Sequence, residues 1–404
     1  MEIKKIIYIT HFIFSRRDYE RFGIEIMKKN GFSIEVWDFT PFLSPEVYKT
    51  LKVPDPINYK KYNIKLFKGN EEIKDQMECF KNNAMVVFLT IPDYRIYPVF
   101  RRLLKLGIPY ALSIPNSVPS FKNTGNSFSI FNNKRLFHFF KKIREINVTK
   151  LKKRISNILM TKYLGINFPK FILAGGTQTL INYNPPIGKK TKIVWGHSFD
   201  YDLYLRDLSK SSKNDLKSKE YAVFIDGYWP FAHDYAYMGV KNPVTPERYY
   251  RSLCKFFNKV EKEMGFKVII AAHPSSMYEK HPDYYESRSV IRGKTMELIR
   301  DAEFVLMHYS TSINFAVLFN KPVIFFTTDE LEDSIIDAKY VRAFSSALGK
   351  RFINIDNDYE TDWIEELMVN KKIYSIYKER YIKKRGTEEK PFWQIVADEI
   401  KNFK

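Results

Sequence analysis

The chain has 404 residues, which is more than one hydrophobic core usually organises, so we expect two domains. Hydrophobic residues make up 45% of the sequence and aromatic residues 16%, a composition that excludes a disordered protein. The formal net charge of +20 attracts polyanions and makes nucleic acid, anionic lipid and phosphorylated substrates the candidate partners.

Three features bear on the cellular compartment. Cys79 and Cys254 have neither the spacing of a zinc site nor that of a disulfide framework, so we expect a reducing, cytoplasmic environment. Thr10 and His11 interrupt the apolar start of the chain and no small-residue cleavage site follows, which predicts a β-strand rather than a signal peptide. No apolar stretch reaches the ~20 residues of a membrane helix, so we expect a soluble or peripherally attached protein.

In the first half of the chain, short β-branched and aromatic runs alternate with helical stretches, a pattern typical of βαβ units and parallel sheets. A helix is predicted over 19–31, with Gly31 at its C-terminal cap. Strands are predicted at 5–10, 32–39, 84–90, 109–114, 170–175 and 191–196.

A serine- and lysine-rich stretch, 206–220, is predicted to be an interdomain linker. The pattern predicts an α/β protein of two Rossmann-like domains, followed by a helical tail. In two-domain proteins of this architecture such a tail commonly packs back on the first domain, and we expect the same here. The domains are expected at 1–205 and 221–360, and the tail at 361–404. The second domain has predicted strands at 221–227, 267–273, 303–308 and 321–326, and a helix at 246–265.

Three motifs in the second half fall where a strand ends, which is where open α/β sheets bind ligands. In the first, Gly227 permits a tight turn that would leave the Asp226 carboxylate facing the interdomain cleft, with His233 and Asp234 in the loop that follows. An ordinary Asp-Gly turn is the alternative interpretation.

The second motif is His273-Pro274, followed by Ser275. Pro274 fixes the chain direction, so His273 is presented at the end of its strand and can donate to a phosphate or protonate a leaving group. A helix cap beside a core histidine is the alternative.

The third motif is a hydroxyl-rich turn before an apolar helix. Free backbone N–H groups and the positive end of the helix dipole would form an anion site there, although the hydroxyls are also ordinary helix caps. The turn comprises Tyr309, Ser310, Thr311 and Ser312.

The first half offers fewer specific candidates for the acceptor side of the cleft. Gly175 and Gly176 follow a strand and would let backbone approach a substrate, or form an ordinary turn. His197, Asp200 and Asp202 are expected near the cleft. Asp200 and Asp202 match an Asp-x-Asp metal motif, but no further acidic cluster accompanies them, so we expect no metal.

Together the three motifs of the second half resemble those of bacterial sialyltransferases and related nonulosonate or Kdo transferases. The resemblance covers mainly 220–330 and implies a GT-B fold with a deep interdomain cleft, an acceptor-side first domain and a second domain that binds the nucleotide sugar. It implies that His273 and the hydroxyl turn hold the CMP phosphate and that Asp226 acts on the acceptor hydroxyl. Those families carry two acidic residues before the glycine, whereas Ile225 occupies the first of these places here.

The function implied is transfer of a nonulosonic acid (pseudaminic or sialic type) or Kdo from a CMP-activated donor to a hydroxyl of a bacterial surface glycan, with no cofactor or metal. The alternatives are a polyol-phosphate transferase of the teichoic-acid kind, a UDP- or GDP-sugar transferase, and an inactive glycan-binding relative. A basic nucleic-acid-binding protein is an alternative of another class. No RNP, helix-turn-helix or zinc-finger pattern supports it, so we expect no nucleic-acid partner.

The segment 134–162 carries ten Lys or Arg residues against one Glu, interleaved with Phe, Leu and Ile at near-helical spacing. Such a basic amphipathic face predicts peripheral attachment to an anionic membrane surface on the inner leaflet, where a lipid-linked glycan acceptor would be found. A solvated helix that covers the first domain is the alternative.

Overall fold

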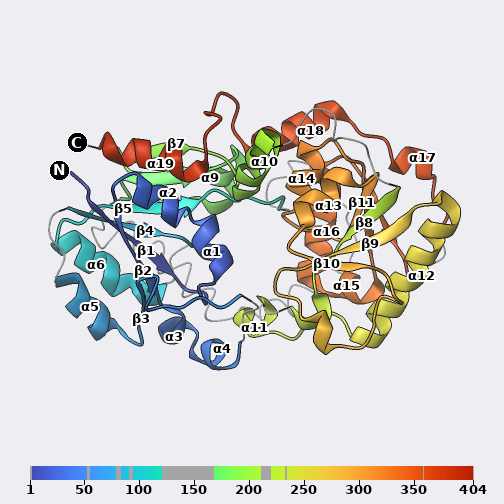
Figure 1. Cartoon of the computed structure of the whole chain (residues 1–404), viewed down its shortest axis with the longest axis horizontal. Coiled ribbons are helices and arrows are strands. Elements are labelled where there is room, and N and C mark those ends of the chain that lie inside the picture. Colours follow the sequence, from blue (N-terminus) through green and yellow to red (C-terminus); the bar gives the residue numbers. More distant parts are fainter. Residues whose placement is uncertain are drawn as a thin grey trace, which may run out of the picture.

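The computed structural model describes eight stretches of the chain. The predicted membrane-binding segment, 134–162, and His233 lie outside the described residues. Figure 1 shows two lobes, each a β-sheet with helices on both faces. The described stretches are 2–51, 55–78, 83–90, 94–120, 168–210, 220–232, 234–357 and 359–403.

The first lobe contains a parallel sheet of order β3-β2-β1-β4-β5-β6-β7. All six predicted strands are confirmed, and the short edge strand β3 was missed because three residues show no clear alternation. The strands are β1 Lys5–Thr10, β2 Ser33–Asp38, β3 Ile64–Leu66, β4 Ala84–Phe88, β5 Tyr110–Ile114, β6 Phe171–Ala174 and β7 Lys192–Trp195. The helices are α1 Arg16–Arg21, α2 Ile24–Lys29, α3 Thr40–Leu43, α4 Pro45–Thr50, α5 Asn70–Glu78, α6 Tyr97–Lys105, α9 Gln178–Tyr183 and α10 Phe199–Lys210.

The second lobe contains a parallel sheet of order β10-β9-β8-β11-β12-β13. The four predicted strands are confirmed, and the two three-residue edge strands were missed. The strands are β8 Tyr221–Ile225, β9 Lys267–Ala272, β10 Val290–Arg292, β11 Phe304–Met307, β12 Val323–Thr327 and β13 Phe352–Asn354. The helices are α11 Asp234–Met238, α12 Pro246–Met264, α13 Thr295–Asp301, α14 Ile313–Leu318, α15 Asp329–Asp333 and α16 Ile335–Ala347.

Both sheets have a topological switch point, where the strand order reverses. In the first sheet it lies between β1 and β4, and in the second between β8 and β11. Ligands of open α/β sheets bind outside the carboxyl ends of the strands at such points. The two sheets therefore define two places at which to look for a site.

The predicted helix at 19–31 is in fact two helices, which meet at Gly23. Gly23 has φ +58°, a left-handed conformation that favours glycine, and a Cβ atom there would overlap the Trp393 ring. The tail residue Trp393 therefore packs into the break between α1 and α2, a contact that local sequence patterns do not reveal.

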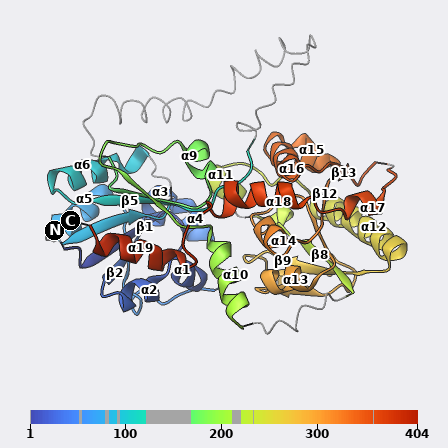
Figure 2. The ribbon, with the colours of Figure 1, turned by 90° about the horizontal axis from the view of Figure 1, so that it is seen from above.

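The helical tail contacts both domains, whereas the expectation from the sequence was that all of it packs on the first. Trp363 of α17 (Trp363–Glu366) donates to Glu263, and Tyr374 of α18 (Lys371–Tyr377) donates to the Lys321 carbonyl, both in the second domain. The π-helical turn η5 follows at Lys378–Ile382, and α19 (Phe392–Lys401) then lies over the first domain (Figure 2). Only this last helix fulfils the expectation.

Helix α10 continues through 206–210, so the first part of the predicted linker is helical. Within the described stretches, no helix is long and apolar enough to cross a membrane.

Candidate functional site

Asp226 follows β8 at the switch point of the second sheet, but its side chain turns inward. It is only 2% exposed. Its Oδ1 accepts from the Tyr228 N–H at 2.8 Å, and its Oδ2 accepts from the Tyr278 hydroxyl at 2.8 Å and the His273 N–H at 3.4 Å. Burial raises the pKa of the Asp226 carboxyl, against the opposing effect of these hydrogen bonds. The expectation that Asp226 faces the cleft is therefore not met, because both of its oxygens are used to hold two loops.

Gly227 also has a different role from the expected one. The left-handed residue of the turn is Tyr228, at φ 55°, whereas Gly227 makes room for the ring of Trp229, which a Cβ atom would overlap. A tyrosine in this conformation is strained, and the hydrogen bond from its N–H to Asp226 helps to hold it.

His273, at the end of β9, is partly exposed as predicted. Its Nδ1 accepts from the Ser275 N–H at 3.3 Å and lies 2.7 Å from the Ser275 hydroxyl, so the neutral ring carries its proton on Nε2. Pro274 and Ser275 form the turn behind it, with the Ser276 N–H bonded to the His273 carbonyl. The ring is thus oriented as a donor from Nε2.

Arg292 is a basic residue at this site that the sequence analysis missed. It pairs with Ala272 at the end of β10, is exposed, and donates to the Ser276 carbonyl at 2.7 Å. Because β10 is an unpredicted edge strand, the only sequence signal was a basic residue ahead of Gly293. The arginine adds positive charge beside the His273 loop.

The hydroxyl turn precedes α14 as predicted, but its backbone is less open than expected. The Ser312 N–H donates to the Ser310 hydroxyl, and the next three N–H groups donate to carbonyls of 310–312. The idea of a cluster of free N–H groups is therefore wrong for 312–315. Thr311 is exposed and Ser310 and Ser312 are partly exposed, so the hydroxyls remain the donors that this turn offers.

Tyr309 is packed into the second domain. Its hydroxyl donates to the buried Asp337, and its ring lies 4.7 Å from that of Trp229. Neighbouring His308 is 1% exposed, with Nδ1 bonded to the Phe326 carbonyl and Nε2 to the Tyr249 hydroxyl, and burial lowers its pKa to about 3. Both side chains are therefore bonded within the second domain, next to the hydroxyl turn.

Asp200 joins this turn to the first domain. It lies in the first turn of α10, and its Oδ2 accepts from Nδ2 of Asn314, the second residue of α14, at 2.8 Å. The residue before it, Phe199, donates its N–H to Asn116 Oδ1 at 3.1 Å. Asp200 therefore links α10 of the first domain to α14 of the second.

His197 and Asp202 instead anchor the tail. The two ring nitrogens of His197 lie 3.0 Å from the Ser198 carbonyl and 2.8 Å from the Lys390 carbonyl, and the side chain is fully buried. Asp202 Oδ1 accepts from the Phe392 N–H at 2.8 Å. Asp200 and Asp202 thus point to different partners, so the Asp-x-Asp spacing creates no shared site.

Gly175 and Gly176 permit close backbone approach, although the approaching chain is the protein itself. A Cβ atom at Gly175 would overlap the Pro115 carbonyl, and one at Gly176 would overlap the Arg380 carbonyl. They hold β6 against the loop after β5 and against η5, and no substrate is needed to explain them.

The acidic candidates do not gather into a metal site. Asp234 is exposed at the start of α11. Among the described residues, no three His, Cys, Asp or Glu side chains are grouped closely enough to hold an ion.

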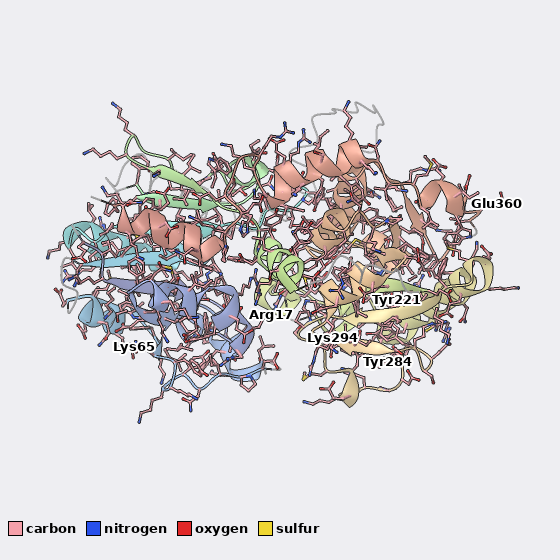
Figure 3. The ribbon with its side chains drawn as sticks, turned by 45° about the horizontal axis from the view of Figure 1, so that its top comes forward. Arg17, Lys65, Tyr221, Tyr284, Lys294 and Glu360 are labelled. Atoms are coloured by element: carbon pink, nitrogen blue, oxygen red, sulfur yellow. The ribbon has the colours of Figure 1, made fainter. Side chains whose placement is uncertain are left out.

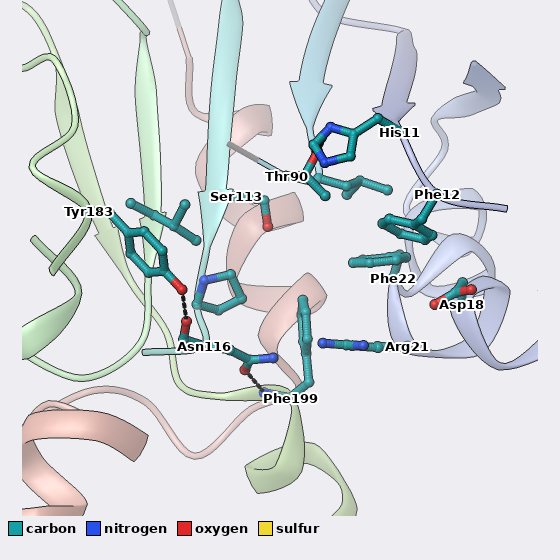
Figure 4. A pocket seen from close by; sticks show the side chains of 13 residues that line it. His11, Phe12, Asp18, Arg21, Phe22, Thr90, Ser113, Asn116, Tyr183 and Phe199 are labelled. Atoms are coloured by element: carbon teal, nitrogen blue, oxygen red, sulfur yellow. Dashed lines mark hydrogen bonds between the residues drawn. The ribbon is translucent and has the colours of Figure 1, made fainter. Parts of the chain in front are cut away.

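A pocket that the sequence analysis did not identify lies at the carboxyl end of the first sheet (Figure 4). It encloses about 530 Å³ and combines aromatic rings with a small set of polar groups. Its lining residues come from the ends of β1, β4 and β5 and from α1, α9 and α10 or next to them: His11, Phe12, Asp18, Arg21, Phe22, Leu89, Thr90, Ser113, Ile114, Pro115, Asn116, Tyr183 and Phe199.

His11 and Thr90 mark the switch point inside this pocket. They follow β1 and β4, the two strands between which the order reverses, and His11 Nδ1 lies 2.9 Å from Thr90 Oγ1. The available sequence signal is a histidine directly after a predicted strand. A titratable ring therefore stands at the ligand-binding edge of the first sheet.

Neither a family model nor a curated protein matches the sequence. Among solved structures, the chain is similar to the wall teichoic acid polymerase TagF, with a TM-score of 0.50 and 11% identity over 98% of this chain and 88% of that one. The UDP-GlcNAc 2-epimerase of Methanocaldococcus jannaschii has a TM-score of 0.49 and 14% identity over 98% and 99% of the two chains. Acinetobacter baumannii MurG has 0.48 and 10% over 99% and 100%. The likeness to TagF agrees with the two-domain GT-B fold.

Proposed function

We propose that the protein is a glycosyltransferase that moves a nonulosonic acid or Kdo from a CMP-activated donor to a hydroxyl of a surface glycan. The observation that carries the proposal is the link between the ends of the two sheets. The pocket residue Asn116 bonds to Phe199, and the next residue, Asp200, bonds to Asn314 beside the hydroxyl turn. The hydroxyl turn and the pocket are therefore joined by a short chain of two hydrogen bonds.

The donor side of the proposal rests on His273, Arg292 and the hydroxyls of 310–312. His273 presents Nε2–H, Arg292 adds a cation, and the turn adds neutral donors. Such groups stabilise the negative charge that develops on a departing nucleotide phosphate. They require no metal ion, so metal-independent transfer remains part of the proposal.

For the acceptor side, we assign the general base to His11. A base must lie within hydrogen-bond reach of the hydroxyl that it deprotonates, and His11 lines a pocket large enough for a sugar. His11, whose Nδ1 lies 2.9 Å from Thr90 Oγ1, accepts the proton as the acceptor oxygen attacks the donor sugar. Asp226, the base expected from sequence, becomes a positioning residue because it is buried and bonds the His273 N–H.

Two measurements test the proposal. The first compares thermal stabilisation by CMP, CDP, UDP and GDP, since a ligand specific to the folded state raises stability by mass action. We expect CMP to stabilise the wild type and to lose its effect in His273→Ala. Stabilisation by UDP or GDP alone would contradict the donor assignment, and stabilisation by CDP alone would favour the polyol-phosphate alternative.

The second measurement concerns His11. We expect His11→Ala to lower the transfer rate at least about 100-fold, the usual contribution of a general base, with CMP stabilisation unchanged. His281→Ala is the control, because that ring bonds Tyr228 outside the pocket. Equal loss in both variants would remove the role from His11.

A further inference from the structure

We propose that the first-domain pocket selects an acidic acceptor sugar, one that carries a carboxylate or phosphate, and that Arg21 and Ser113 bind the acidic group. This inference rests on the proposed function, since it names the class of substrate that the acceptor pocket takes. Two groups lining the pocket carry it, a guanidinium and a hydroxyl, and both lack the partners that such groups normally have.

Arg21 is the first of these groups. Its guanidinium lies over the Phe199 ring, with Cζ 5.0 Å from the ring centroid, and lines the cavity (Figure 4). In the described structure it makes no hydrogen bond or ion pair with any residue. Its five N–H donors match a carboxylate or phosphate in a two-pronged geometry. An arginine that lies over an aromatic ring and has no hydrogen-bond partner among the described residues can use its N–H donors to bind an anion.

The charges around Arg21 are consistent with this assignment. Burial lowers the pKa of Arg21 and the neighbouring Arg17 charge lowers it further, whereas the Asp18 and Asp200 charges raise it, and an anion in the pocket would act in the same direction as these carboxylates. Asp18 and Asp200 are the nearby carboxylates, but each is engaged elsewhere. Asp18 Oδ2 accepts from the Ser15 hydroxyl at 2.6 Å, and Asp200 Oδ2 accepts from Asn314 at 2.8 Å.

Ser113 is the second group. It is the last residue but one of β5, lines the pocket, is only 3% exposed, and its hydroxyl has no hydrogen-bond partner. Figure 4 shows this hydroxyl directed into the cavity. A buried hydroxyl without a partner is costly and rare, so an oxygen of the ligand is the natural occupant of the space before it.

The tail helix keeps Arg21 in place. The Trp393 Nε1–H donates to the Arg21 carbonyl at 3.1 Å, and Arg21 is the last residue of α1. The backbone that carries the guanidinium is thus fixed before any ligand arrives, which reduces the entropy lost on binding.

The test measures binding of three probes to the full chain by isothermal titration calorimetry, without nucleotide: glucuronic acid, glucose 6-phosphate and glucose. We expect at least one acidic probe to bind at least about tenfold more tightly than glucose. Arg21→Gln should lower that affinity about tenfold or more, and Ser113→Ala at least threefold. Arg16→Gln is the matched control, because Arg16 is on the same helix but is exposed and paired with Glu20.

Ser113→Ala should leave the unfolding transition unchanged or raise it, since the lost hydroxyl has no partner, so its effect on affinity cannot come from misfolding. Unchanged affinity in either pocket variant, or equal binding of glucose and both acidic probes, would overturn the inference. If CMP binds and no acidic sugar does, the inference fails and the proposed function stands. If acidic sugars bind through Arg21 and no nucleotide binds, the reverse holds.

Discussion

The carboxylate of Asp200 accepts a hydrogen bond from the side-chain amide of Asn314, with 2.8 Å between the two atoms. Asp200 is the second residue of α10, which follows the first sheet, and Asn314 is the second residue of α14 in the second domain. Burial raises the pKa of Asp200, while the bond from Asn314 and the charge of Arg21 act in the opposite direction. This bond is a polar connection between the two halves of the proposed site.

The first prediction is that Asp200→Ala weakens this connection. Asn314 Oδ1 already lacks a partner, so the substitution leaves the buried amide without the Nδ2 bond and should cost about 1–3 kcal/mol of unfolding free energy. We expect transfer activity to fall along with stability, as urea unfolding and a transfer assay will show. Asp333→Ala, on the exposed end of α15, is the control. Equal stability of both variants would mean that the bond is dispensable.

The second prediction concerns Asp226, whose carboxylate accepts hydrogen bonds from the backbone N–H groups of Tyr228 and His273. We expect Asp226→Asn to keep the fold but weaken CMP binding, since the amide nitrogen cannot accept one of these bonds. A catalytic base would show the opposite, namely normal CMP binding with lost transfer. Calorimetric titration with CMP and a transfer assay on the same variant separate the two roles.

The third prediction concerns acid stability and His308. Its folded-state pKa of about 3 lies below the ordinary value of 6.5, so between these values the unfolded chain binds the additional proton. The contribution of neutral His308 to the free energy of unfolding is therefore fully present above pH 6.5. It falls as the pH decreases, by up to about 1.4 kcal/mol per pH unit. Urea midpoints at pH 7.5 and 5.0 should show a smaller loss for His308→Gln than for the wild type. An identical loss would contradict a neutral buried ring.

The fourth prediction is that transfer survives chelation, because the proposed phosphate contacts come from His273, Arg292 and hydroxyl groups. The measurement is activity in EDTA, followed by addition of Mg²⁺. Complete loss that Mg²⁺ restores would show that the phosphate needs an ion as well as these side chains.

The fifth prediction is that 134–162 attaches the protein to anionic membranes. Each basic group near the surface contributes about 1 kcal/mol, so neutralising five of them should release the protein from anionic vesicles. The variant replaces Lys141, Lys142, Lys152, Lys153 and Arg154 with Gln. The control replaces five exposed lysines elsewhere, Lys60, Lys61, Lys255, Lys262 and Lys267.

Co-sedimentation with anionic and neutral vesicles provides the measurement, and added salt should weaken attachment because it screens the charges. Equal sedimentation of the variant and the control would identify the segment as a solvated surface.

The sequence by itself determined the two parallel sheets, most of their strands and the position of the His273 motif. Hydrophobic periodicity and the residues that end strands and begin helices are local properties of the sequence. It also placed a histidine at 11 and a threonine at 90. It did not show that they meet, since they are 79 residues apart and are brought together only by the pairing of β1 with β4.

The tertiary structure alone decided the direction of the side chains. Asp226 and Arg21 are both charged residues near the end of a strand or helix. The identity of their sequence neighbours does not show which of the two side chains has hydrogen-bond partners within the protein. Tyrosines from distant segments pack around Asp226, whereas Arg21 is left over an aromatic ring at the edge of a cavity. Hydrogen-bond satisfaction depends on which atoms meet across the folded chain, and that is why the sequence placed the His273 motif at a strand end but did not reveal the pocket in the first domain.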